Sequence, residues 1–146
     1  LIPGSIIELI ATEDPAVVRI RPQKKRTNKE WLKTLLIGAD GGVVMALLRQ
    51  QVYAGFDERM AIAIPDEVAL DKLWKDRETK RPPLKNDVML MLSELTKLNQ
   101  QRHVHFIDLY ASLNVIRRVS PQELIKALTE SENFVHVGDD YYHLAE

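Results

Sequence analysis

The sequence predicts an α+β fold in two parts joined by a short linker. Three observations indicate this. Alternation of apolar and polar residues near the N-terminus favours strands, an apolar stripe at helical spacing begins at Leu84, and Thr-Lys-Arg-Pro-Pro separates the two. We therefore predict a small mixed α/β subdomain over residues 1–78, a linker over residues 79–83 and a module of three helices plus a β-hairpin over residues 84–146.

The composition is that of a globular protein without a membrane span or a thiol site. Of the 146 residues, 45% are hydrophobic and 28% are charged, and the net charge is −1. No apolar run approaches the ~18–20 residues that a membrane-spanning helix needs. The absence of Cys excludes disulfides and cysteine nucleophiles. The chain begins at Leu1 without a signal-peptide pattern, and we expect a cytoplasmic segment of a larger protein.

Two short strands are predicted near the N-terminus, over residues 5–10 and 16–21. In the second, Val18 and Ile20 alternate with Arg19 and Arg21. Glu13-Asp14-Pro15 between the strands is typical of a turn. We therefore expect an antiparallel hairpin.

Residues 28–53 allow two interpretations. Asn28 can cap a helix that is broken by the glycines of residues 38–42. Alternatively, residues 34–37 form a strand that leads through the glycine loop into a helix. Both interpretations place a helix over residues 43–53, because its apolar residues recur at helical spacing. A strand over residues 60–64 and an amphipathic helix over 66–77 complete this part; the helix would bury Leu70, Leu73 and Trp74.

The C-terminal region carries the clearest helical signals. A stripe at spacings of four and three residues predicts one long helix: Leu84, Val88, Met91, Leu95 and Leu98. A second helix is predicted over residues 106–113. Ser120-Pro121-Gln122-Glu123 is a capping box with Pro at the first helical position and predicts the start of a third helix.

A β-hairpin is predicted to follow, with Asp139-Asp140 as its turn. In that register His136 faces His143, and Val135 faces Leu144. Residues 103–106 alternate in the same way and predict a third strand. All four histidines would then share one face of this sheet, and imidazole is a common metal ligand and pH switch. The candidates are His103, His105, His136 and His143.

The order helix, strand, helix, turn, helix, hairpin over residues 84–144 resembles a winged helix-turn-helix domain. The resemblance implies a third helix that reads the major groove of DNA. The outward positions of that helix, however, hold two carboxylates and one lysine. Winged-helix domains also serve as protein-interaction modules, so both partners remain open.

Positive charge is concentrated at the other end of the chain. Residues 1–35 hold seven Lys or Arg against four Asp or Glu, and residues 84–146 hold six against nine. Basic clusters bind phosphate backbones; on a strand edge they also block aggregation. The predicted nucleic-acid-binding residues are Arg19, Arg21, Lys24, Lys25, Arg26, Lys29, Lys33, Arg117, Arg118 and Lys126.

The N-terminal half also resembles the core of the PD-(D/E)xK nucleases. The shared pieces are the strand over residues 16–21, a helix carrying Gln50-Gln51 and Tyr53, and the strand over residues 60–65. Those enzymes hold a metal with an acidic residue and an E-x-K strand. This chain has Arg19-Ile20-Arg21 at that strand, so the resemblance implies a fold without the activity.

The sequence therefore predicts a non-catalytic nucleic-acid-binding or regulatory domain that needs no cofactor and has no membrane contact. The first alternative is a protein-interaction or oligomerisation module without nucleic-acid contact, whose partner is a protein or a second copy. The second alternative is a divergent or inactive nuclease fold.

Overall fold

The structure, a computed structural model, describes residues 7–22, 28–52, 59–99 and 102–145. Within them the chain is α+β, with four helices and three small antiparallel sheets. The strands are β1 (Ile7–Ala11), β2 (Val18–Pro22), β3 (Asn28–Ile37), β4 (Val43–Val52), β5 (Val104–His105), β6 (Phe134–His136) and β7 (Tyr141–Leu144). The helices are α1 (Glu67–Lys80), α2 (Leu84–Leu98), α3 (Phe106–Ile116) and α4 (Pro121–Glu130). Among these helices, none has the length and apolar content needed to cross a membrane.

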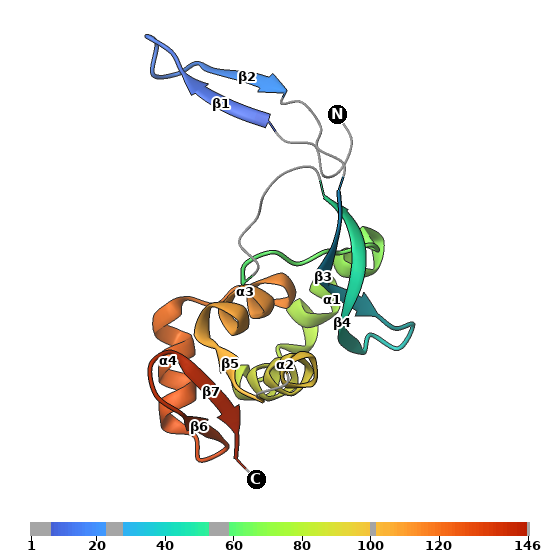
Figure 1. The fold of residues 1–146 in the computed structure, drawn as a ribbon, viewed down its shortest axis with the longest axis vertical. Helices are drawn as coiled ribbons and strands as arrows, with labels where there is room; N and C mark the ends of the chain where they lie inside the picture. The colour runs from blue at the N-terminus through green and yellow to red at the C-terminus, as the bar shows by residue number, and fades with distance from the viewer. Residues whose placement is uncertain (1–6, 23–27, 53–58, 100–101, 146) are drawn as a thin grey trace.

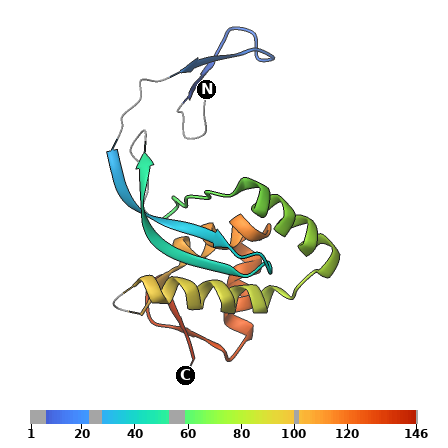
Figure 2. The same ribbon diagram turned by 90° about the vertical axis from the view of Figure 1, so that its right-hand side faces the viewer.

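The elements are arranged as one body and a projecting hairpin. In Figure 1, β1 and β2 stand away from a body that contains the other elements. Figure 2 shows the β3–β4 ribbon lying alongside α2, with α1 drawn above the ribbon and α3 and α4 behind and below it. The body therefore packs one curved hairpin on a group of helices.

The first hairpin confirms the prediction from alternating residues. β1 and β2 pair antiparallel, with Leu9 opposite Ile20 and Glu8 opposite Arg21. Asp14 shapes the turn, since its Oδ1 accepts a hydrogen bond from the Ala16 amide at 3.0 Å. One face of this hairpin is therefore apolar throughout, and the other carries its charged side chains together with Ile10.

Residues 28–52 form a longer hairpin, and the helices predicted there are wrong. β3 and β4 pair along their full ten-residue lengths. Only the strand expected over residues 34–37 is confirmed. In β4, Val43 and Met45 are buried while Val44 between them is exposed, which is the period of two that a strand requires. An almost uninterrupted apolar run satisfies the helical period as well, so the pattern alone did not distinguish them.

The glycine segment closes this hairpin. Gly38 N donates to Gly42 O at 2.8 Å, and Asp40 Oδ1 accepts from Gly42 N at 2.9 Å. Gly41 has φ +85°, a conformation that favours glycine. The segment therefore leads into a strand rather than into a helix.

The strand predicted over residues 60–64 is reduced to a single parallel bridge between Ala63 and Thr34. Ala63 N donates to Lys33 O at 2.8 Å and Leu35 N donates to Ala63 O at 2.9 Å. α1 begins after Asp66, whose side chain caps it, and it buries Leu73 as predicted. The helix continues through Lys80, past the predicted end at residue 77.

The C-terminal helices confirm the predictions made for them. α2 buries the centre of its apolar stripe at Val88, Met91 and Leu95. The capping box of α4 is complete: Glu123 N donates to Ser120 Oγ at 3.1 Å, and Ser120 N donates to Glu123 Oε1 at 3.2 Å. Hydrogen bonds from the side chain and backbone of Ser120 lower the pKa of Glu123 below its ordinary value of 4.5. The carboxylate form therefore stabilises the start of α4.

The terminal hairpin pairs one residue out of the predicted register. His136 lies opposite Tyr142 rather than His143, and Val135 lies opposite His143. The physical reason is Phe134, which is 7% exposed where Val135 is 37% exposed. Because a one-residue shift exchanges the two faces of a strand, burial of the phenylalanine decides the register.

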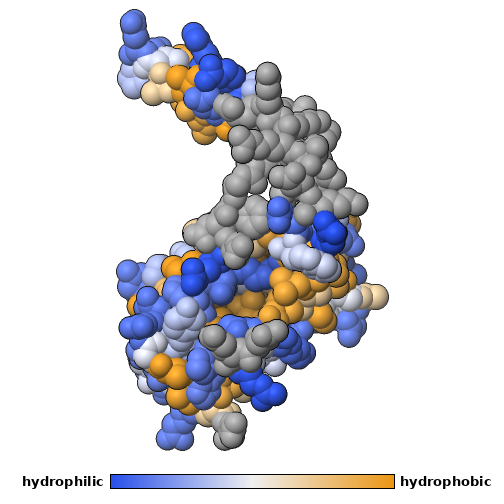
Figure 3. Space-filling view, in the orientation of Figure 1, coloured by the Kyte–Doolittle hydropathy of each residue, from blue (hydrophilic) through white to orange (hydrophobic). Residues whose placement is uncertain are grey.

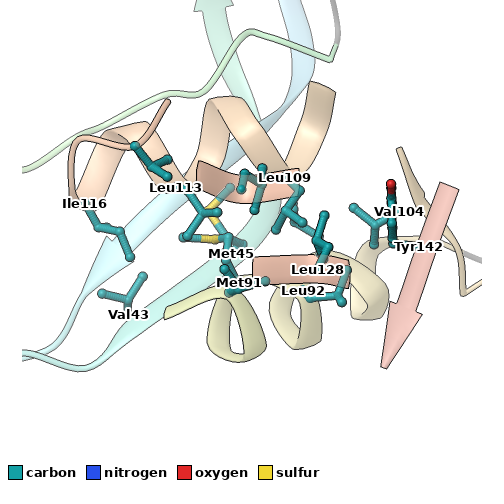
Figure 4. Close-up of a cluster of buried hydrophobic side chains, with 14 of the residues drawn as sticks. Val43, Met45, Met91, Leu92, Val104, Leu109, Leu113, Ile116, Leu128 and Tyr142 are labelled. Carbon is teal, nitrogen blue, oxygen red and sulfur yellow. The ribbon is translucent and has the colours of Figure 1, made fainter. Parts of the chain in front are cut away.

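One buried cluster holds the two predicted parts of the chain together. Figure 4 shows Met45 of β4 close to Met91 of α2 and Leu113 of α3. Because α1 extends to Lys80, the linker predicted over residues 79–83 is reduced to residues 81–83. Both sides of that linker therefore contribute to the same core.

Candidate interaction surfaces

The predicted basic set does not form one continuous patch in the part of the chain that the structure describes. The side chains of four of its members fall outside that part: Lys24, Lys25, Arg26 and Lys29. Arg19 is exposed on β2. Arg21, two residues on, forms an ion pair with Glu8 at 2.5 Å. The charge of this hairpin is therefore partly neutralised.

Lys33 links β3 to α3 instead of facing solvent. Its Nζ lies 2.5 Å from Asp108 Oδ1 and donates to the carbonyl oxygen of Arg59 at 2.9 Å. The side chain is only 11% exposed. Both hydrogen bonds are internal, so this lysine has little surface left for a phosphate group.

Arg117 belongs to a buried ion network that sequence reasoning missed. Asp87, at the start of α2, is 3% exposed. Arg77 of α1 donates to both of its oxygens at 2.7–2.9 Å. Arg117 donates to Asp87 Oδ2 at 3.0 Å and to the carbonyl of Pro82 at 2.9 Å. One carboxylate is thus shared by two guanidinium groups from helices on either side.

A cleft of about 330 Å³ opens beside this network. We call it the arginine cleft, and its lining residues are Trp74, Arg77, Glu78, Arg81, Pro82, Asp87, Ile116, Arg117 and Arg118. The Trp74 indole N–H donates to the carbonyl of Val115 at 2.8 Å, which fixes the ring against α3. Arg118, predicted as a nucleic-acid contact, is exposed at this cleft.

The outward face of α4 is mixed in character. Lys126 is exposed, with Glu130 4.0 Å away. Ile125 beside it is also exposed, as are Val135 and Val137 of the adjoining hairpin. These residues place apolar and acidic groups where a DNA-reading helix needs cations.

The histidines do not gather on one face, contrary to the prediction. His103 and His143 stack with ring centroids 5.9 Å apart. The pairing puts His105 on their face and His136 on the other, where it stacks on Tyr142 at 4.7 Å. His105 Nδ1 accepts from Ile107 N at 3.0 Å and so caps α3. Across the described residues, no group of three or more His, Asp or Glu side chains is arranged to hold a metal ion.

Two apolar faces are exposed on the hairpins. The first, the arm face, covers one side of β1–β2: Ile7, Leu9, Ala11, Val18, Ile20 and Pro22. The second, the ribbon face, lies on the outer side of β3–β4: Leu36, Val44 and Leu48. Figure 3 shows hydrophobic residues in the projecting hairpin beside hydrophilic ones, and again on the body. Exposed apolar surface of this kind is typical of interaction sites.

No protein-family model matches the chain, and no curated protein or solved structure matches it either. What the protein does is therefore inferred from these surfaces.

Proposed function

We propose that the chain is a non-catalytic interaction module that pairs with a second copy of itself. In this pairing the arm face of each copy packs on the ribbon face of the other. The observation that carries the proposal is the arm face, where Leu9 and Ile20 lie opposite each other and are 64% and 57% exposed. Apolar burial is the dominant favourable term in protein association.

The arm needs a neighbour to be stable. A two-stranded hairpin in water is marginal by itself, because one face of it has nothing to pack against. Here the polar side carries the Glu8–Arg21 ion pair, and the apolar side holds the six residues of the arm face. Such an amphipathic hairpin requires an apolar surface of similar width.

The ribbon face offers such a surface on the same chain. Leu36 and Val44 lie opposite each other near the turn of β3–β4, and Leu48 lies further along the same side. All three are exposed, while Leu32 and Thr34 on the same side are buried. On the other side Leu35, Val43 and Met45 are buried in the core, and Trp31 and Leu47 are exposed. Because each chain carries both surfaces, a dimer with twofold symmetry would form two identical contacts between an arm face and a ribbon face. Both surfaces of both copies would then be buried.

Charge also favours a second copy as the occupant. Residues 1–35 carry seven Lys or Arg against four Asp or Glu, whereas residues 84–146 carry six against nine. The arm itself, residues 7–22, holds two arginines against three acids. The attraction to the acidic C-terminal region of another copy would therefore come from Lys24, Lys25 and Arg26, which follow β2 in the sequence. The net charge of −1 leaves little repulsion between whole chains.

For the C-terminal part we propose a winged helix that contacts protein rather than DNA. The element order α2, β5, α3, α4, β6, β7 supports this assignment. Ile125 is exposed on α4, and Val135 and Val137 are exposed on the adjoining hairpin. Glu123 and Glu130 share the helix with Lys126. Apolar and acidic groups together suit a protein surface better than a phosphate backbone.

Molecular mass in solution tests the dimer. We expect sedimentation velocity to show a species of twice 16.7 kDa that gains population as the protein concentration rises. Replacing Leu9 and Ile20 with lysine removes the centre of the arm face. Loss of two buried apolar side chains should raise the dissociation constant by at least about a hundredfold.

The matched control changes the opposite side of the same hairpin. Replacing Glu8 and Arg21 with glutamine leaves the net charge and the arm face unaltered, and the mass should stay that of the dimer. Helical circular dichroism of every variant checks that the body remains folded. A wild-type chain that stays monomeric at the highest attainable concentration, or equal weakening by both double variants, would contradict the proposal.

Nucleic-acid binding is the second candidate, favoured by the exposure of Arg19 and Arg118. It predicts that fluorescence anisotropy with a mixed-sequence DNA duplex shows binding that weakens steeply with salt. Changing Lys24, Lys25 and Arg26 to alanine should then reduce the slope of the logarithm of the binding constant against the logarithm of the salt concentration by up to about three. The control, Lys72 and Lys75 to alanine on α1, should leave the slope unchanged. Absence of binding even at low salt would reject this candidate.

A further inference from the structure

We propose that the arginine cleft binds an oxyanion, a carboxylate or phosphate group carried on a small apolar body. The cleft lies between the end of α1, the start of α2 and the end of α3. It is separate from the arm and ribbon faces, so the inference does not depend on the proposed dimer.

The cleft carries an excess of positive charge. Four of its lining residues are arginines and two are acidic. Of the two acids, Asp87 is already bonded by Arg77 and Arg117. One carboxylate cannot neutralise two guanidinium groups, so a positive charge remains beside a buried position. Arginine is suited to such a site because its planar fork matches the geometry of a carboxylate or phosphate.

The guanidinium groups are not saturated by the protein. Arg117 uses Nη1 for both of its hydrogen bonds, to Asp87 and to Pro82, and its Nη2 donates to no atom of the described residues. The Nε atoms of Arg77 and Arg117 are buried without a partner. Buried donors are nearly always paired in folded proteins. An anion in the cleft would supply acceptors to Arg117 Nη2, and a small rotation would bring a buried Nε into reach.

The remaining lining selects an apolar body behind the anion. Trp74 of α1 and Pro82 supply apolar surface, and Ile116 of α3 also lies in the wall but is fully buried. The indole is fixed by its hydrogen bond to Val115. At about 330 Å³ the cleft is at the lower end of ligand-site volumes. Arg81 and Arg118 are exposed and can attract an anion from solution.

NMR titration tests the site directly, because the chain has only two tryptophans. Phenyl phosphate and benzoate present the two oxyanions on one apolar ring, and benzamide is their neutral counterpart. We expect the Trp74 indole resonance to shift saturably with one or both anions and not with benzamide. The Trp31 resonance should stay in place, since Trp31 lies on β3 and outside the cleft. The anion that binds more tightly shows whether the cleft prefers a phosphate or a carboxylate group.

Substitutions at the exposed side of the cleft complete the test. Changing Arg81 and Arg118 to glutamine should weaken binding by about tenfold or more, because it removes two positive charges that attract the anion to the cleft. Lys126→Gln removes an exposed charge from α4, away from the cleft, and should change nothing. Failure of both anions to shift Trp74, equal shifts with benzamide, or full affinity in the double variant would each overturn the proposal.

Discussion

Replacing Asp87 with alanine is expected to lower the free energy of unfolding by about 3–5 kcal/mol. The carboxylate is 3% exposed and receives hydrogen bonds from both Arg77 and Arg117. Its removal leaves two guanidinium groups beside each other, largely out of water and without a counter-charge. The penalty comes mainly from those uncompensated cations. Urea unfolding followed by circular dichroism measures the difference between wild type and variant.

An exposed ion pair in the same region provides the control. Asp71 and Lys75 lie 3.2 Å apart on α1, and their side chains are 71% and 73% exposed. Asp71→Ala should change the unfolding free energy by less than about 1 kcal/mol, because water screens that pair. Equal losses from Asp71→Ala and Asp87→Ala would show that burial is not what makes Asp87 important.

The helical half of the fold could be predicted because its signals are local. The apolar stripe of α2 and the capping box of α4 each depend on residues close together in the sequence, and both are found as expected. The β3–β4 hairpin was missed because its apolar residues follow one another almost without a break. The buried positions Val43 and Met45 alternate only once the strands are packed on α2 and α3. Tertiary packing, not local pattern, makes that choice.

The candidate sites, too, could be predicted from the sequence only where their features are local. Arg117 and Arg118 could be found from sequence as basic residues in a turn. Their surroundings could not, because Arg77 and Asp87 come from other helices and nothing local marks them as partners. Lys33 shows the converse: it belongs to a basic stretch of sequence, yet it pairs with Asp108, which is 75 residues away. The sequence therefore shows which residues are charged, and only the fold shows which of those charges are exposed and not engaged in internal ion pairs.

Met45→Ala is expected to destabilise the whole body by about 2–5 kcal/mol, the range for a buried large-to-small change. Met45 is 3% exposed and joins the cluster formed by Met91 of α2 and Leu113 of α3. If residues 1–78 and 84–146 folded as separate domains, Met45→Ala would leave the unfolding of the C-terminal helices unchanged.

A shared core predicts the opposite. Circular dichroism of the helices and tryptophan fluorescence should then show one unfolding transition, shifted by the same amount for both signals. Leu47→Ala on the same strand is the control, because Leu47 is exposed and should cost little. Two separate transitions would show that residues 1–78 and 84–146 fold as separate domains. A single shifted transition would show that the apolar side of the β3–β4 hairpin completes the core formed by the C-terminal helices.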